Sequence, residues 1–380
     1  MAREGLGTNT PMRILVISNC PLDPNQGSGY VISGFARRMR ERGHEVVAYG
    51  IEHFTPWQHM RRFTRLRRLL GYAYATRRHA HAASFDIVEL WGAEGWLALL
   101  ALRLARHGKP VAVSRSNGLE THWRELTGSD GSGPAAWLRR FIGGLPEIAF
   151  RGCAALTVVS RFDARFARER AYQPEPRLLV MENALEPVWL GQSPRFGRQP
   201  VIGFVGNWLA NKGSELMPAV MRQVLAATPS VRFLLVGVGK QAQAAIASEF
   251  PGESRIETVA FCPRDQIAEH YRRMAILLVP SFFESFGLVA AEAMSCGAAL
   301  AATRTGFAAD LGDSEFAPID ERTPDGIART LIALVHDEPR RQALARAGHA
   351  RVQKLDWAAT TDRLEMLYRS LLASTHARRA

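Results

Sequence analysis

The apolar positions of the chain fall into short runs that alternate with longer stretches of helical spacing. Continuous apolar runs bounded by turn residues are typical of strands that are buried on both faces. Strands that alternate with helices predict a parallel sheet covered on both sides. In the first half the expected strands are 13–18, 44–50, 86–90, 110–115, 155–160 and 177–182, and the clearest helical patterns are 29–42, 94–107 and 136–151.

The same alternation restarts after a break near the middle of the chain. Residues 186–200, EPVWLGQSPRFGRQP, are rich in Pro and Gly and show no periodicity, so we interpret them as a linker. The pattern after the linker predicts a second parallel sheet. Its expected strands are 201–206, 231–237, 255–261, 275–280 and 298–303, and residues 323–373 have helical spacing throughout.

The chain is therefore expected to form two doubly wound α/β domains. We place an N-terminal Rossmann-like domain at 11–185, the linker at 186–200 and a second such domain at 201–355. A final helix over 356–380 is expected to pack back toward the N-terminal domain. Ligands of such sheets bind outside the carboxyl ends of the strands, so the cleft between the two domains is the expected site.

The composition narrows the class of partner. The formal net charge is +12 and the pI is about 10.2, which favours anionic partners such as nucleotides, phosphates or acidic lipids. The four cysteines are far apart and form no metal-ligand pattern, which fits a reducing cytoplasm. The first ten residues lack the apolar core of a signal peptide, and no apolar run approaches a membrane span, so we expect a cytoplasmic protein.

One segment, 54–81, contains seven arginines and no Asp or Glu. Phe63, Leu66, Leu70 and Tyr74 recur within it at helical spacing. A basic amphipathic helix of this kind can lie on an anionic membrane, at the inner face of the membrane for a cytoplasmic protein. The alternative is a helix that packs on the sheet and leaves a solvated basic face.

Glycines or a lysine follow the first strand of each expected domain. Gly27 and Gly29 lie where the first helix begins, and Lys212 lies in VGNWLANKGSEL, after the strand 201–206. Glycines at a helix start let backbone N–H groups approach an anion, and a lysine binds phosphate as a point charge. A flexible turn and a surface lysine are the alternatives, but the position at strand ends favours anion sites.

The stretch SFFESFGLVAAEAMSCG, residues 281–297, carries two carboxylates in an otherwise small and apolar sequence. Glu284 lies in the loop after a strand, and Glu292 lies inside a helix that begins near Gly287. The free N–H groups near Gly287 and Leu288 suit a phosphate, and Glu284 can reach a ligand hydroxyl. A buried Glu292 needs partners, such as the hydroxyls of a ribose or a cation.

These motifs resemble a known family. PSFFESFGLVAAEAMSCG looks like the E-x(7)-E signature of the retaining, nucleotide-sugar-dependent glycosyltransferases of family 4, which have the GT-B fold of two Rossmann-like domains. The likeness covers nearly the whole chain and is stronger in the second half. It also includes NQGSGYVISGFARRMRERGHEV, LTVVSRFDARF, MENALEP, FVGNWLANKG, LLVGVG, AATRTGFAADL and LDWAATTDRLEMLY.

The resemblance implies a metal-independent transfer of a sugar from a nucleotide diphosphate sugar with retention at the anomeric carbon. It implies that Glu284 contacts the donor sugar, that Lys212 neutralises the leaving diphosphate and that Glu292 holds the ribose. The donor-binding residues that it implies are Gly27, Gly29, Asn207, Lys212, Gly237, Phe261, Glu284, Ser285, Phe286, Gly287, Leu288 and Glu292. No metal and no separate cofactor are expected.

The sequence departs from the family pattern at three positions. Many members have Arg where this chain has Asn207, so either Lys212 works with backbone amides alone or Arg264 or Arg304 supplies the second cation. Many members have a His where SRSNGLETHW has Asn117, and MENALEP has Ala184 where Gly is usual. Asn can bind a hydroxyl but cannot take a proton. The acceptor candidates are Asn117, Glu120 and His122, and Asn117 joins Glu284 and Lys212 as a catalytic candidate.

We therefore expect a hexosyltransferase of polysaccharide or glycoconjugate biosynthesis that uses a UDP- or GDP-sugar. The acceptor would be a glycan, a lipid-linked glycan or a small molecule, and no nucleic acid is expected because the chain has no nucleic-acid-binding motif. One alternative is another GT-B enzyme, such as a nucleotide-sugar 2-epimerase, against which Asn117 argues mildly. The other is a non-catalytic basic binding protein, which leaves Glu284 and Glu292 unexplained.

Overall fold

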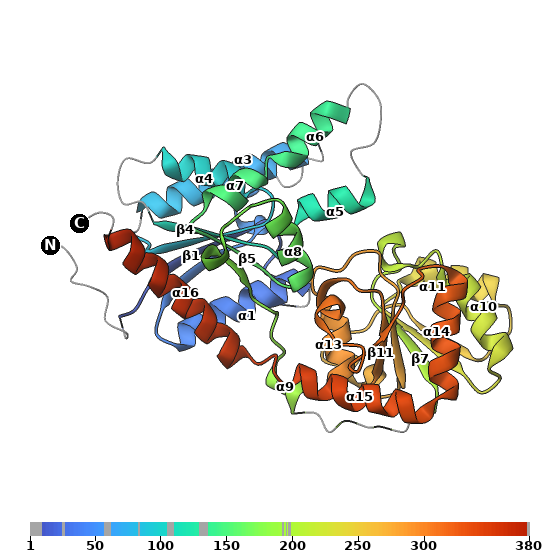
Figure 1. Cartoon of the computed structure of the whole chain (residues 1–380). Coiled ribbons are helices and arrows are strands. Elements are labelled where there is room, and N and C mark those ends of the chain that lie inside the picture. Colours follow the sequence, from blue (N-terminus) through green and yellow to red (C-terminus); the bar gives the residue numbers. More distant parts are fainter. Residues whose placement is uncertain are drawn as a thin grey trace. The chain divides into compact units, whose positions relative to one another are not determined.

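The chain forms two compact units, each built on its own parallel sheet (Figure 1). The computed structural model describes residues 10–24, 27–56, 62–82, 84–104, 110–128, 136–191, 194, 196 and 199–377. Unit 1 comprises Met1–Asn183 and Trp357–Ala380, and unit 2 comprises Ala184–Asp356.

The sheet of unit 1 has the strand order β2-β1-β3-β4-β5-β6, and all neighbours are parallel. Each strand expected from the sequence is present, with ends that differ from the expected ones by at most two residues. The strands are β1 Arg13–Ser18, β2 Glu45–Tyr49, β3 Ile87–Trp91, β4 Val111–Arg115, β5 Ala155–Val158 and β6 Leu178–Val180.

Helices cover both faces of this sheet. Figure 1 shows α3, α4, α6 and α7 on one side of it and α1 and α16 on the other. The helix expected over 136–151 is two helices, because Gly143, Gly144 and Pro146 interrupt it. The helices of unit 1 are α1 Gly27–Glu41, α2 Ile51–Phe54, α3 Thr64–Ala82, α4 Gly95–Arg103, α5 Glu120–Thr127, α6 Ala136–Gly144, α7 Glu147–Gly152, α8 Arg161–Glu169 and α16 Trp357–Ala377, with a 3-10 turn at Glu175–Arg177.

The last helix, α16, is held to the sheet of unit 1 by a buried polar network. The hydroxyl of Tyr368 donates to the Glu89 carboxylate at the centre of the sheet, and Trp91 Nε1 donates to the same carboxylate at 2.8 Å. Arg115 Nη1 adds a third contact at 3.3 Å. At the start of α16 the Trp357 ring packs edge-on against Phe35, with centroids 5.0 Å apart.

Unit 2 has a sheet of order β12-β11-β10-β7-β8-β9, again parallel throughout. Its strands are β7 Val201–Val205, β8 Arg232–Val236, β9 Ile256–Val259, β10 Ile276–Val279, β11 Ala299–Ala302 and the short β12 Ala317–Pro318, which the sequence pattern did not predict. Its helices are α9 Pro187–Leu190, α10 Met217–Ala227, α11 Lys240–Glu249, α12 Ile267–Tyr271, α13 Leu288–Ser295, α14 Pro324–His336 and α15 Glu338–Val352, with 3-10 turns at Ala210–Lys212 and Gly306–Asp310.

Candidate functional site

The loops at the carboxyl ends of the unit 2 strands bring together residues that are far apart in the sequence. The loop after β7 contacts the loop after β10, because the Phe282 N–H donates to the Asn211 carbonyl at 2.8 Å. Gly213 is essential to this approach, since a Cβ there would lie 2.6 Å from the Pro280 carbonyl oxygen and its φ is +82°. The two loops therefore form one rim at this edge of the sheet.

Two of the expected catalytic residues form an ion pair on this rim. Lys212 Nζ lies 2.6 Å from Glu284 Oε1, and Ser281 Oγ donates to the same oxygen at 2.7 Å. Glu284 is buried, whereas about a third of the Lys212 side chain is exposed. The carboxylate is thus held in place by two donors while the ammonium group still reaches solvent.

Gly287 is the N-cap of α13, and its backbone explains why it is glycine. Its φ is +89°, in the left-handed region that side chains disfavour. A Cβ there would make only ordinary contact with Glu284, at 3.6 Å, so the constraint is conformational rather than steric. Glycine has no side chain to cap the helix, and of the first-turn N–H groups that of Ala290 donates to the Gly287 carbonyl at 3.0 Å. Approach of a ligand to Gly287 stays a prediction.

The loop after β11 packs against Glu284 and Phe286. The Phe307 N–H donates to the Phe286 carbonyl at 2.7 Å, and the two rings lie 5.2 Å apart. Gly306 has φ +54°, and a Cβ there would lie 2.6 Å from the Phe286 oxygen and 2.9 Å from Glu284 Cβ. Gly306 therefore permits two backbones to touch, a role that sequence reasoning did not identify.

Glu292 lies on α13, almost fully buried, between two partners. Arg264 Nη2 lies 2.6 Å from Oε1, and the Tyr271 hydroxyl donates to Oε2 at 3.0 Å. Burial raises the pKa of Glu292, and the charge of Arg264 opposes that rise. The cation expected beside a buried carboxylate is thus Arg264, while contact with a ribose stays a prediction. Arg264 or Arg304 is also the expected second cation for the diphosphate. Arg304 forms exposed pairs with Asp313 and Asp320, and contact of either arginine with a phosphate stays a prediction.

The other residues of unit 2 that are expected to bind the sugar donor lie on the same edge of the sheet. Asn207 is exposed after β7, and Gly237 follows β8 with φ +80°. Phe261 follows β9 and is 80% exposed, which is unusual for an aromatic side chain. Ser285 and Leu288 are half-buried on either side of Gly287.

In unit 1 the structure brings Asn117 and Glu120 to the carboxyl edge of the sheet, after β4. Glu120 Oε1 accepts a hydrogen bond from the Ala93 N–H at 3.0 Å. Asn117 Oδ1 and Glu120 Oε2 are buried and have no hydrogen-bond partner among the described residues. Burial, with a smaller effect from the nearby Glu94 carboxylate, raises the pKa of Glu120 to about 7. Buried oxygens without partners are uncommon and need an explanation.

His122 lies in a different environment from Asn117 and Glu120. Its Nδ1 is 2.8 Å from Asp163 Oδ1, and its ring stacks on Phe166 with centroids 4.3 Å apart. Both His122 and Asp163 are buried, and burial raises the pKa of Asp163. This pair joins α5 to α8, and binding of an acceptor by His122 stays a prediction.

The glycines at the start of α1 are divided between two environments. Gly29 is buried, and a Cβ there would lie 2.2 Å from the Asp23 carbonyl oxygen and 2.6 Å from that of Pro21. Its small size is therefore required by packing within unit 1. Gly27 is exposed. The expected contact of both residues with phosphates stays a prediction.

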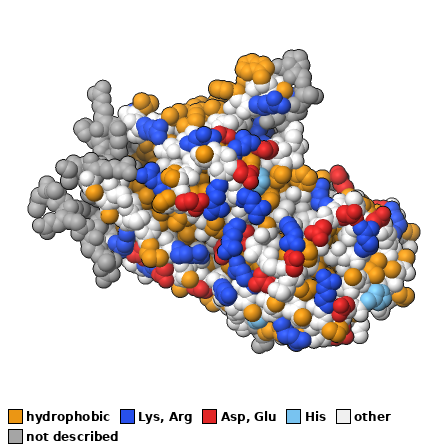
Figure 2. Space-filling model, in the orientation of Figure 1, with side chains coloured by type: hydrophobic (Ala, Val, Ile, Leu, Met, Phe, Trp, Pro, Cys, Tyr) orange, Lys and Arg blue, Asp and Glu red, His pale blue; other side chains and the backbone are white. Residues whose placement is uncertain are grey.

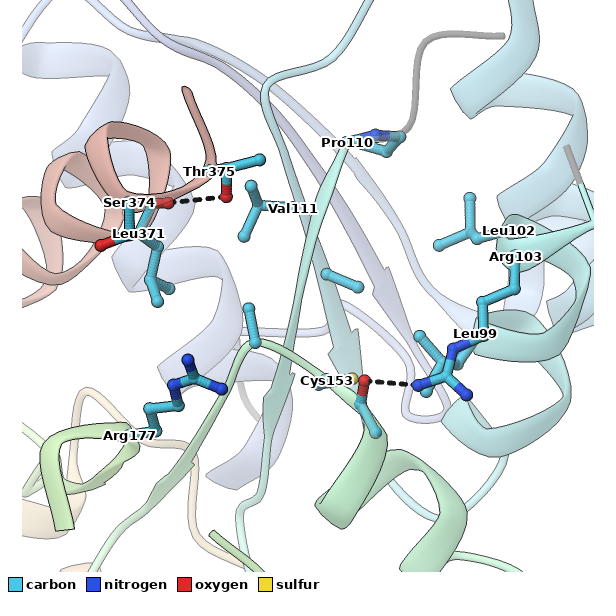
Figure 3. Close-up of a pocket in the computed structure, with 13 residues that line it drawn as sticks. Leu99, Leu102, Arg103, Pro110, Val111, Cys153, Arg177, Leu371, Ser374 and Thr375 are labelled. Carbon is cyan, nitrogen blue, oxygen red and sulfur yellow. Dashed lines mark hydrogen bonds between the residues drawn. The ribbon is translucent and has the colours of Figure 1, made fainter. Parts of the chain in front are cut away.

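A cavity of about 360 Å³ lies at the opposite edge of the unit 1 sheet and contains none of the expected site residues. It opens beside the amino ends of β4 and β5, between Leu99 and Leu371 (Figure 3). Arg103 reaches across one side of it and donates to the Gly152 carbonyl at 2.8 Å. The candidate site is therefore defined by strand ends and not by this cavity.

The family of unit 2 follows from comparison of its sequence. Residues 187–351 match the sequence model of the family described as glycosyl transferases group 1. Unit 2 is a glycosyl transferases group 1 domain. This group 1 domain contains Lys212, Glu284 and Glu292, and the match confirms the family suggested by the E-x(7)-E stretch.

Curated relatives of the group 1 domain are glycosyltransferases. The chain is 31% identical over 182 residues to the D-inositol 3-phosphate glycosyltransferase of Segniliparus rotundus, which covers 46% of this chain and 40% of that protein. It is 28% identical over 171 residues to the phosphatidylinositol N-acetylglucosaminyltransferase gpi3 subunit of Schizosaccharomyces pombe, which covers 44% and 38%. The chain thus matches less than half the length of these relatives.

Solved structures confirm the GT-B fold beyond the group 1 domain. Sucrose-phosphate synthase from Thermosynechococcus elongatus aligns with a TM-score of 0.77 over 96% of this chain and 100% of that one, at 17% identity. The catalytic domain of starch synthase IV from Arabidopsis thaliana, bound to ADP and acarbose, aligns with a TM-score of 0.70 over 96% and 100%, at 13% identity.

Sequence reasoning missed several residues that shape the group 1 domain site. Tyr271 and Ser281 hold the two carboxylates, and Gly306 allows the backbone contact behind Glu284. Gly306 had a signal, because it lies in AATRTGFAADL, a stretch that resembles a family loop. Tyr271 had none, since only the packing of α12 against α13 brings it to Glu292.

Proposed function

We propose that this protein is a retaining glycosyltransferase that transfers a sugar from a nucleotide diphosphate sugar to a glycan, lipid-linked or small-molecule acceptor without a metal ion. The observation that carries the proposal is the Lys212–Glu284 pair on the rim beside the N-terminus of α13, inside a group 1 domain. The relatives described as glycosyltransferases support it. We further propose that the protein works in the cytoplasm.

The donor would bind to unit 2 with its diphosphate at the start of α13. Backbone N–H groups at Gly287 and Leu288 would hold the phosphates, where the helix dipole favours negative charge. An ammonium group carries three N–H donors, so Lys212 can hold Glu284 and a phosphate oxygen together. Lys212 would then stabilise the charge that develops on the leaving diphosphate. Glu284 would accept hydrogen bonds from the sugar hydroxyls.

The nucleoside would extend from the phosphates across the strand ends of unit 2. Glu292 would bind the ribose hydroxyls, with Arg264 and Tyr271 keeping its carboxylate in position. Phe261 is an exposed aromatic ring on which the base can stack. Asn207, Gly237, Ser285 and Phe286 complete the unit 2 part of the donor site in this proposal.

The acceptor would bind at the carboxyl edge of the unit 1 sheet. The two oxygens without partners, Asn117 Oδ1 and Glu120 Oε2, are hydrogen-bond acceptors for a polyol. A substrate hydroxyl that donates to them offsets the free-energy penalty of leaving them unpaired. Glu120 can also take a proton near neutral pH, which Asn117 cannot.

The basic segment of unit 1 suggests that the acceptor lies at a membrane surface. Helix α3 belongs to the basic segment 54–81, of which residues 57–61 lie outside the described part. Its arginines and outward apolar side chains suit an anionic lipid surface. We therefore propose that the acceptor is a lipid-linked or membrane-associated glycan.

A donor panel tests the function directly. Incubation of the protein with UDP- and GDP-sugars should reveal binding of at least one of them by calorimetry, and slow hydrolysis without an acceptor by product analysis. Absence of binding by every nucleotide sugar would overturn the proposal and favour a non-catalytic binding protein. Release of an epimerised sugar instead of the original one would identify a 2-epimerase.

A further inference from the structure

Helix α3 turns its apolar stripe away from unit 1. The stripe consists of Leu66, Leu70 and Tyr74 of the helix and Phe63 directly before it, which are 52–74% exposed. The opposite side of the helix packs on the sheet through Tyr72, whose buried hydroxyl donates to the Ile17 carbonyl at 2.8 Å. Packing on the sheet therefore does not account for the stripe, which needs a different partner.

Helix α6 presents a second exposed apolar face on the same unit. Trp137, Leu138, Phe141 and Ile142 are 44–69% exposed, and no residue of the helix is buried. The helix is held by α5, because Arg124 Nη2 donates to the Arg139 carbonyl at 2.8 Å. Exposed aromatic and aliphatic side chains gathered on one short helix mark an interaction surface.

The two helices lie on the same side of the unit 1 sheet (Figure 1). In Figure 2 hydrophobic side chains gather along this upper edge, above all over α6, and are mixed with arginines. The α3 stripe and the α6 face are therefore two parts of one side of unit 1.

The charge of these helices is of one sign. Their exposed arginines are Arg65, Arg68, Arg77, Arg78, Arg139 and Arg140, and neither helix contains Asp or Glu. A surface that combines arginine with Trp, Tyr and Phe suits a lipid headgroup region, where an aromatic ring meets acyl chains and a guanidinium meets phosphate. A protein partner of mixed charge has no comparable match.

We propose that unit 1 binds the surface of an anionic lipid bilayer through α3 and α6 together. The arginines attract the bilayer, and the apolar side chains of both helices enter the headgroup region. Two helices define an orientation, which one helix cannot, so the same side of unit 1 always faces the lipid. No helix among the described residues is long and apolar enough to cross a membrane.

Vesicle co-sedimentation of the full chain tests this inference. The protein should bind phosphatidylcholine vesicles that contain phosphatidylglycerol, and binding should fall as salt rises because salt screens the arginines. Trp137→Ser with Phe141→Ser should lower the partition coefficient by about tenfold or more, and Leu66→Ser with Leu70→Ser should do the same. The effect of the α6 pair separates this two-helix surface from binding by the basic segment alone.

The matched control lies on α16, on the other side of the sheet. Met366 is exposed there, so Met366→Ser likewise removes an exposed apolar side chain without changing the charge and should leave vesicle binding unchanged. All substituted side chains are exposed, and the far-UV circular dichroism and melting temperature of each variant should match those of the parent protein. An effect of the control equal to that of the α6 pair would overturn the proposal.

Two further outcomes would overturn it. One is the absence of binding to anionic vesicles at low salt. The other is self-association in sedimentation velocity that the α6 substitutions abolish, which would identify a second copy as the partner. Vesicle binding is measured without nucleotide sugar, so its failure leaves the proposed glycosyl transfer standing, and failure of donor binding leaves this surface standing.

Discussion

At the scale of single residues, the candidate site is organised by carboxylates in three different states. Glu284 is paired with an ammonium group that reaches solvent, and Glu292 is paired with Arg264 in the interior. Glu120 has one oxygen without a partner and a pKa raised to about 7. The first two states suit acceptance of hydrogen bonds from ligand hydroxyls, and the third suits proton exchange.

The division of roles between the glutamates predicts different kinetic defects. Glu292→Ala should weaken binding of the free nucleotide diphosphate by tenfold or more, because it removes the ribose acceptor and releases Arg264 and Tyr271. Glu284→Ala should mainly lower kcat, since it removes contacts to the sugar. Titration calorimetry with UDP and GDP, combined with steady-state rates, separates the two. Equal losses of nucleotide affinity in the two alanine variants would contradict this assignment. Tyr271→Phe, which removes only one hydrogen bond to Glu292, serves as a milder control.

The raised pKa of Glu120 predicts that the stability of the fold depends on pH. Its folded pKa of about 7 lies above the ordinary 4.5, so the folded state binds the proton more tightly. Its contribution is fully present below about pH 4.5 and is lost as the pH rises toward 7, by roughly 2–3 kcal/mol. Glu120→Gln should flatten this part of the profile in urea unfolding and should be more stable than the parent at pH 8. Glu125→Gln on the same helix, which removes an exposed carboxylate, should not.

At the scale of elements, the site depends on how two helices begin. Helix α13 begins at a left-handed glycine that supplies no side-chain cap, and a Cβ there would make only ordinary contact with Glu284. Helix α1 begins under a tight loop, because Gly29 packs against Pro21 and Asp23. The start of α13 therefore needs glycine for its backbone conformation, whereas the start of α1 needs glycine at position 29 for packing.

Gly287→Ala should reduce both stability and nucleotide affinity. A side chain at φ +89° costs about 1–2 kcal/mol of folding free energy and shifts the helix start. Gly252 offers a matched control, since its φ is +73° and a Cβ there would meet open space. Both alanine variants should lose similar stability in thermal unfolding, and only the Gly287 variant should lose nucleotide affinity. A Gly252 variant with the same affinity loss would show that strain alone is responsible.

At the scale of the whole molecule, the chain leaves unit 1, forms unit 2 and returns to unit 1 with α16. The returning helix inserts Trp357 beside Gly34 and Phe35 and places Tyr368 on the buried Glu89. Unit 1 is therefore completed by residues that follow unit 2 in the sequence, whereas unit 2 is continuous in sequence.

Trp357→Ala should destabilise unit 1 selectively. Removal of this buried ring should cost about 3–5 kcal/mol in the unfolding of unit 1, because the space that it fills next to Tyr30 and Phe35 becomes a cavity. Amide hydrogen exchange followed by mass spectrometry should show faster exchange in β3 and α1 and little change in β7 and α13. Leu331→Ala, in the core of unit 2, should produce the reverse pattern.

Much of the fold and part of the site could be predicted from local pattern. Buried strands such as 13–18 and 201–206 are readable because both faces of a parallel strand are apolar. Lys212 lies in the loop after β7 and Glu284 in the loop after β10, and parallel strands place the loops at their carboxyl ends along one edge of the sheet. The very short β12 and the break between α6 and α7 were not predicted, because two residues have no period and the glycines and proline compete with strong helical spacing.

What the sequence determined by itself is the set of strands, their common polarity and hence the edge at which the chemistry lies, since all of these depend on local periodicity. Tertiary structure decided which side of each element is covered. It turned the apolar stripe of α3 outward, buried Glu292 against Tyr271 and left oxygens of Asn117 and Glu120 without partners. These outcomes depend on contacts between residues far apart in the chain, so no local pattern contains them.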